Sequence, residues 1–81
     1  MNNSNYFPAL QRRITKLYPD LTAKQVTHIC NLISNYLRSF KDDIWGVEVA
    51  NMPFNRNDPG YFSYHKVSVC GVTVFIRITV D

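Results

Sequence analysis

Hydrophobic side chains in the first half of the chain recur at spacings of three and four, which is the period of an α-helix. The first run starts around Pro8, a residue that suits the first helical turn because its missing N–H would have no partner there. The run ends before Pro19, which disfavours the α conformation in the residue that precedes it. We therefore predict a helix over about residues 6–18. Its hydrophobic positions are Phe7, Leu10, Ile14 and Leu17.

A second helical run begins at Thr22 with a capping box. The Thr22 hydroxyl can accept a hydrogen bond from the backbone N–H of Gln25, while the Gln25 side chain can reach back to Thr22. This pattern predicts a helix over about residues 22–41, joined to the first helix by a link short enough for an αα-hairpin. Its apolar face carries Val26, Ile29, Cys30, Ile33, Leu37 and Phe40.

After Asp43 the hydrophobic period changes to two, which indicates β-strands. A segment rich in turn-forming residues separates the first strand from the second. Cys70 and Gly71 can form a two-residue hairpin turn between the second strand and the third. The three predicted strands cover about residues 44–52, 61–69 and 72–80.

The element order ααβββ predicts an α+β fold in a single domain that spans residues 1–81. Without a long crossover, the simplest assembly is a helical hairpin packed on one face of a three-stranded antiparallel meander. The third strand of a meander is an edge, and here only Arg77 interrupts its apolar run. A long apolar edge invites pairing with another chain, so we predict a homodimer or β-augmentation through residues 72–80. The alternative is a central third strand, with the first strand inserted elsewhere in the sheet.

The two-residue turn also determines which side chains of the hairpin share a face, because side chains alternate along a strand. One face carries aliphatic side chains and His65, and it should lie under the helices. The helices should leave the opposite face open, and that face combines aromatic with basic side chains. Its candidate site residues are Phe62, Tyr64, Lys66, Phe75 and Arg77.

Aromatic side chains interleaved with cations on an open sheet can serve two kinds of partner. They can stack nucleobases and hold phosphates. They can equally form the energetic centre of a protein interface, where aromatic residues and arginine are enriched. A third interpretation is structural, because such pairs also stabilise exposed strands by cross-strand contact alone.

Charge adds a second candidate surface. The formal net charge is +3, but residues 1–41 carry six basic residues against one acidic, while residues 42–81 carry three basic against five acidic. A basic half favours an acidic partner, whether nucleic acid or protein. Arg12, Arg13 and Lys16 cluster on the predicted solvent side of the first helix, although a solvated helix face is the commoner meaning of such a cluster.

No catalytic motif stands out, and we predict that the chain is not an enzyme. Neither His28 nor His65 is paired at motif spacing with a nucleophile or an orienting acid. A ribonuclease site would have to combine His65 with the tyrosine and the cations of the aromatic face, but alternation places His65 on the other face. The sequence also lacks the ligand spacing of a zinc or calcium site, so no metal and no cofactor are predicted.

The cysteines and the first residues bear on the compartment. Cys30 and Cys70 are too few for a disulfide framework, and free thiols in a reducing cytosol are the simplest interpretation. The first five residues are polar and lack the basic and apolar regions of a signal peptide. No apolar run approaches the ~20 residues that span a bilayer. We therefore predict a cytoplasmic protein that has no membrane partner.

Four functional hypotheses follow. The first is a small interaction protein that inhibits or regulates a larger protein or nucleoprotein, a class that includes the inhibitors that phages or plasmids direct at host nuclease complexes. The second is a single-stranded nucleic-acid-binding domain that uses the aromatic and basic face. The third is a small ribonuclease toxin, and the fourth is a structural subunit whose exposed face and edge only form a homo-oligomer.

Overall fold

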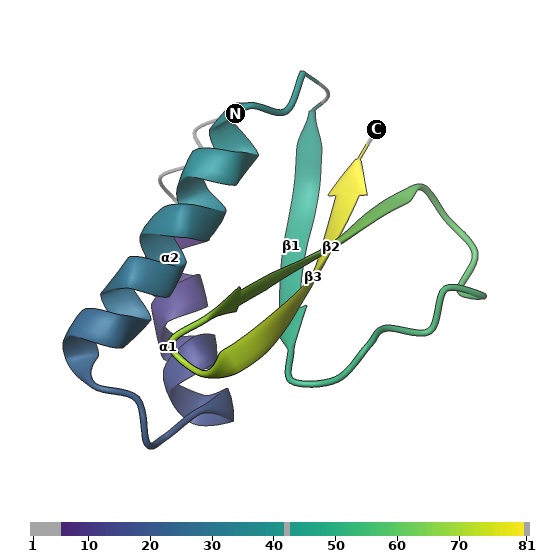
Figure 1. Ribbon diagram of the computed structural model, residues 1–81. Helices are drawn as coiled ribbons and strands as arrows, with labels where there is room; N and C mark the ends of the chain where they lie inside the picture. The colour runs from purple at the N-terminus through teal and green to yellow at the C-terminus, as the bar shows by residue number, and fades with distance from the viewer. Residues whose placement is uncertain (1–5, 42, 81) are drawn as a thin grey trace. The chain divides into compact units, whose positions relative to one another are not determined.

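The computed structural model describes residues 6–41 and 43–80. Two helices are followed by three strands that form one antiparallel sheet, which confirms the predicted α+β class and element order (Figure 1). The chain divides into two compact units, a helical unit that ends at Phe40 and a sheet unit that begins at Lys41. That all 81 residues form one domain stays a prediction. The elements are α1 (Phe7–Leu17), α2 (Ala23–Arg38), β1 (Ile44–Ala50), β2 (Phe62–Val69) and β3 (Val72–Val80).

The helical unit is an αα-hairpin whose second helix begins with the predicted capping box. The backbone N–H of Gln25 donates to the Thr22 hydroxyl over 3.2 Å, and the backbone N–H of Thr22 donates to the Gln25 side chain over 2.9 Å. Helix α2 ends sooner than predicted, at Arg38, where Ser39 caps it and donates its hydroxyl to the Tyr36 carbonyl. The two helices pack against each other. The buried apolar residues of this unit are Leu10, Ile14, Val26, Ile29, Cys30, Ile33 and Leu37.

The strand order of the sheet is β1-β3-β2, so the predicted meander is wrong and β3 is the central strand (Figure 1). The tight turn pairs β2 with one edge of β3, and the segment 51–61 is long enough for β1 to pair with the opposite edge. Both edges of the most apolar strand are thereby hydrogen-bonded. The predicted homodimer or β-augmentation through residues 72–80 is therefore wrong, because β3 has no free edge.

The hairpin of β2 and β3 has the predicted register. Val69 lies opposite Val72, and the same offset continues to the far end of the hairpin. Cys70 and Gly71 have φ values of 56° and 76°. Two positive φ values are typical of a type I′ turn, the two-residue turn whose twist matches that of the flanking strands. The turn therefore determines which residues of β2 and β3 share a face.

The two faces of the sheet differ as the alternation predicted. On one face, Val74, Ile76 and Ile78 of β3 are buried. On the other, Tyr64 of β2 and Glu48 of β1 lie on either side of Arg77. We call this second face the aromatic face. It consists of Glu48, Phe62, Tyr64, Lys66, Phe75 and Arg77.

Candidate functional site

Arg77 is held on the aromatic face by two carboxylates. Its Nε and Nη2 donate to the same Glu48 oxygen over 3.1 Å and 2.7 Å, and its Nη1 donates to Asp58 over 2.8 Å. The hydrogen bond to Glu48 is the largest cause that raises the pKa of Arg77 above its ordinary value, and the hydrogen bond to Asp58 is the second largest. Only 15% of the Arg77 side chain is exposed, against about half of each carboxylate side chain. Arg77 thus connects the central strand both to β1 and to the segment 51–61.

Aromatic rings complete this connection. The guanidinium carbon of Arg77 lies 4.5 Å from the ring centre of Phe62 and 5.1 Å from that of Phe54. The Phe54 ring centre lies 6.5 Å from that of Tyr64. Phe54 belongs to the segment 51–61, so this segment folds over the aromatic face. The face is consequently half-buried where the sequence predicted it to be open, and of its predicted site residues only Lys66 is exposed.

The covering segment has a specific backbone requirement at its end. Gly60 has a φ of 130°, a conformation that residues with a Cβ rarely adopt. A Cβ added there would lie 3.0 Å from a ring carbon of Phe62, which is closer than ordinary van der Waals contact. Within the same segment, the Asn55 side chain accepts a hydrogen bond from the backbone N–H of Asn57. The approach of the segment to the aromatic face therefore depends on the glycine.

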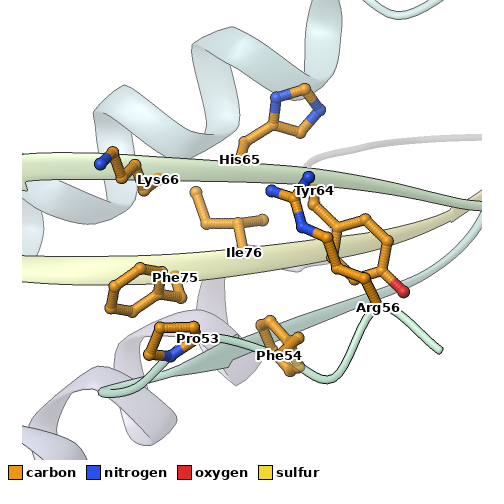
Figure 2. Close-up of a pocket in the computed structure, with 8 residues that line it drawn as sticks. All are labelled: Pro53, Phe54, Arg56, Tyr64, His65, Lys66, Phe75 and Ile76. Carbon is orange, nitrogen blue, oxygen red and sulfur yellow. The ribbon is translucent and has the colours of Figure 1, made fainter. Parts of the chain in front are cut away.

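A pocket of about 370 Å³ lies between the segment and the sheet (Figure 2). This volume is within the range of small-molecule and side-chain binding sites. Its walls are largely aromatic or apolar, and the Arg56 guanidinium lies 4.9 Å above the ring centre of Tyr64. The lining residues are Pro53, Phe54, Arg56, Tyr64, His65, Lys66, Phe75 and Ile76.

The pocket is positively charged. Arg56 and Lys66 line it, and no acidic side chain does. Both cations are exposed, and neither forms an ion pair with any residue in the described part of the chain. Arg77, in contrast, has its charge balanced by Glu48 and Asp58. The free positive charge of the aromatic face therefore lies at the pocket.

His65 contributes to the lining but is oriented differently from its neighbours. Figure 2 shows its ring pointing away from that of Tyr64, as the alternation predicted. Its Nε2 is hydrogen-bonded to the Ser63 hydroxyl over 2.5 Å. Burial, and then the charge of Arg56, lower the pKa of His65 below 6.5. The imidazole is therefore neutral at neutral pH, and it does not lie on the same face as Arg77.

Several large apolar side chains of the sheet unit are strongly exposed. Trp45 is 67% exposed and lies where the register of β1 shifts, and Tyr61 is 81% exposed beside the end of β3, where its carbonyl accepts from Val80. Met52 is 66% exposed and directly precedes the pocket residue Pro53. The sequence analysis did not identify these three as surface residues.

The structure brings the predicted residues of the aromatic face together, and it adds others. Lys66 and Phe75 lie opposite each other, as do Tyr64 and Arg77. Arg12, Arg13 and Lys16 are exposed on α1. The sequence analysis missed the residues that cover or clamp the face. Arg77, a single arginine in an apolar strand, was the one signal, and it pointed only to the acidic residues among them, because a half-buried cation needs acidic partners. The missed residues are Glu48, Phe54, Arg56 and Asp58.

Within the described ranges, no group of three or more His, Cys, Asp or Glu side chains lies close enough together to hold a metal ion. Among the same residues, no helix is both long and apolar enough to cross a membrane. Comparisons with protein-family models, with curated proteins and with solved structures found no match to this chain.

Proposed function

We propose that this chain is a non-enzymatic interaction protein that binds a larger protein through the pocket and the aromatic face, and so inhibits or regulates it. The observation that carries the proposal is the pocket itself, in which aromatic walls surround two cations that have no ion pair among the described residues. Aromatic side chains and arginine are the residue types that dominate the energetics of protein interfaces. The finer form of the proposal is an inhibitor that a phage or plasmid directs at a host nuclease complex.

Arg77 and its contacts with Glu48, Asp58, Phe54 and Phe62, which we call the Arg77 clamp, support this proposal because they organise the site before a partner binds. Its three hydrogen bonds and two ring contacts connect β1, β2 and the covering segment. A pre-organised site loses less conformational entropy when it binds. In this proposal Arg77 is a positioning residue, while Arg56, Lys66 and Phe75 contact the partner.

Charge favours a protein partner over nucleic acid at this site. Residues 41–81 carry four basic and five acidic residues, a net charge of −1. Non-specific nucleic-acid binding depends on neutralising several phosphates in a row. Arg56 and Lys66 are only two cations, and two cations do not form such a row. A compact pocket for one or two anionic groups suits a protein surface better.

The second candidate function is single-stranded nucleic-acid binding, which one observation favours. Residues 1–40 carry five basic residues against one acidic, and three of the basic residues lie exposed on α1. In this alternative, bases stack on the aromatic face, and the positive charge of the helical unit attracts the nucleic acid. Replacing Arg12, Arg13 and Lys16 by Glu should then weaken binding of a labelled oligothymidylate, with a steep salt dependence. A protein partner at the pocket should bind this variant almost as tightly as the parent.

Site-specific photocrosslinking tests the proposed function. A benzophenone amino acid replaces Met52, which is exposed beside the pocket, and in a matched control it replaces Leu32, which is exposed on α2. After irradiation in native lysate, we expect a protein adduct from position 52 that survives nuclease treatment and disappears when Lys66 is also changed to Glu. Equal adducts from both positions, or adducts that nuclease removes, would contradict the proposal.

A further inference from the structure

One edge of the sheet lies next to the pocket. The order β1-β3-β2 makes β2 an edge strand, and among the described residues it pairs with β3 alone. β2 also contributes Tyr64, His65 and Lys66 to the pocket lining. An unpaired strand edge presents a row of backbone donors and acceptors to any segment that approaches it.

The hydrogen-bond pattern shows which backbone groups point outward. The N–H of Val80 donates to the carbonyl of Tyr61 over 3.1 Å, so these two residues form a hydrogen-bonded pair. Hydrogen-bonded and non-hydrogen-bonded pairs alternate along an antiparallel ladder. The residues of β2 whose N–H and C=O point away from β3 are therefore Phe62, Tyr64, Lys66 and Ser68.

These four residues are also the residues of β2 whose side chains lie on the side of the aromatic face. A strand added antiparallel to β2 would place alternate side chains directly beside them, with Cβ atoms roughly 5 Å apart. Side chains opposite Tyr64 and Lys66 would thus enter the pocket. The backbone of such a segment could form hydrogen bonds with the edge of β2, while its side chains bind in the pocket.

We infer that the partner contributes an extended acidic segment that adds to the free edge of β2 and places a carboxylate between Arg56 and Lys66 in the pocket. This inference rests on the proposed function and specifies its partner. Among the described residues, the pocket cations Arg56 and Lys66 form no ion pair and no acidic residue lines the pocket, so a carboxylate is the complementary group. Its aromatic and proline walls fit an apolar side chain two positions away on the same face of the added strand.

Other occupants fit less well. A second copy of β2 would bring no carboxylate to the pocket, because residues 62–69 contain no acidic residue and would place a second Lys66 near the first. A nucleic acid could supply anionic groups, but it has no peptide backbone to pair with the outward N–H and C=O groups. An acidic peptide segment matches both features.

Peptide selection tests the chemistry of the segment. A phage-displayed library of extended peptides, with Thr at alternate positions and random residues between, is selected on the immobilised full chain. We expect enrichment of Asp or Glu at one random position and of an aromatic or aliphatic residue at the next random position. Enrichment of basic residues, or no enrichment of any kind, would overturn the inference.

Charge reversal then tests the site with the selected peptide, synthesised with a fluorescent label. Arg56→Glu and Lys66→Glu should each weaken binding roughly tenfold, because each places a like charge beside the peptide carboxylate. Arg13→Glu makes the same change in net charge on α1 and should alter affinity by less than about twofold. If all three variants weaken binding equally, the carboxylate does not bind in the pocket.

Backbone methylation tests the edge. Methylating the amide nitrogens at the pocket-facing positions removes the N–H groups that would pair with β2, so binding should be lost. Methylating the intervening Thr positions places the methyl groups away from β2, so binding should be kept. Equal affinity of the two methylated peptides would overturn strand addition.

The outcomes also separate this inference from the proposed function. If the photocrosslink at position 52 forms but the library selects no acidic segment, the inference fails and the proposed function stands. If oligothymidylate binds and displaces the selected peptide, both fail. A dimer in the native mass spectrum that blocks peptide binding would show that a second copy occupies the edge, and it would also overturn the inference.

Discussion

Replacing Gly60 by alanine should loosen the segment that covers the aromatic face. At a φ of 130°, the alanine Cβ makes the backbone conformation unfavourable by about 1–3 kcal/mol. The same Cβ would lie 3.0 Å and 3.1 Å from two carbons of the Phe62 ring, so that ring must also shift. Phe62 lies under the Arg77 guanidinium, and the disturbance therefore reaches the clamp.

The size of the effect has an upper limit. The segment 51–61 is largely exposed, so it can detach from the face when the strain exceeds its docking free energy. The free energy of unfolding should therefore fall by the smaller of these two quantities, which we place at about 1–2 kcal/mol. Peptide binding at the pocket should fall further, because a detached segment removes Phe54 and Arg56 from the site.

Urea denaturation and peptide titration measure the two effects. The matched control is Gly46→Ala, because its added Cβ would make only ordinary contacts of 3.7 Å and 3.9 Å with Thr79 and its φ is not positive. We expect a lower urea midpoint with an unchanged slope for Gly60→Ala, and a difference within about 0.5 kcal/mol of the parent for the control. If the two variants have equal stability and equal affinity, the assigned role of Gly60 is wrong.

Three further predictions concern the clamp, the turn and the histidine. Arg77→Met should speed tryptic cleavage after Arg56, because the segment 51–61 loses the hydrogen bond that joins its Asp58 to the central strand. Arg77→Lys should be cleaved at an intermediate rate, and an unchanged rate in Arg77→Met would refute the clamp. Cys70→Asn should raise the free energy of unfolding by about 0.5–1 kcal/mol, because asparagine tolerates a positive φ better than cysteine does, and a decrease in the urea midpoint would count against this. Because burial lowers the pKa of His65 in the folded state, the contribution of His65 to stability should be fully present above about pH 6.5 and should be lost as the pH falls below it, since the unfolded chain then binds the extra proton. His65→Gln should reduce that pH dependence in urea titrations, and an unaltered dependence would show that His65 is not its source.

Local sequence rules were enough to predict the elements and one hairpin. Thr22 and Gln25 are three residues apart, and their capping box forms as predicted. Cys70 and Gly71 form the expected turn, and the register of β2 and β3 follows from it. These features depend on residues that are close in the chain, so local geometry determines them.

The candidate site was predicted only in part. Lys66 and Phe75 were placed on one face correctly, because they belong to the hairpin with the predicted register. The cover of that face was missed. Glu48 is 29 positions from Arg77 in the chain and Asp58 is 19 positions away, and no periodic pattern connects residues so far apart.

The sequence by itself determined where the helices and strands form and which side chains of the β2–β3 hairpin share a face, since spacing, caps and turn chemistry act over a few residues. Only the tertiary structure decided that β3 is the central strand, that Arg77 draws the segment 51–61 over the aromatic face, and that a charged pocket forms beneath it. The physical reason is that these features arise from contacts between distant segments. The order β1-β3-β2 leaves the apolar strand β3 without a free edge. The pocket forms because the segment 51–61 supplies Asp58 as a partner for the half-buried Arg77.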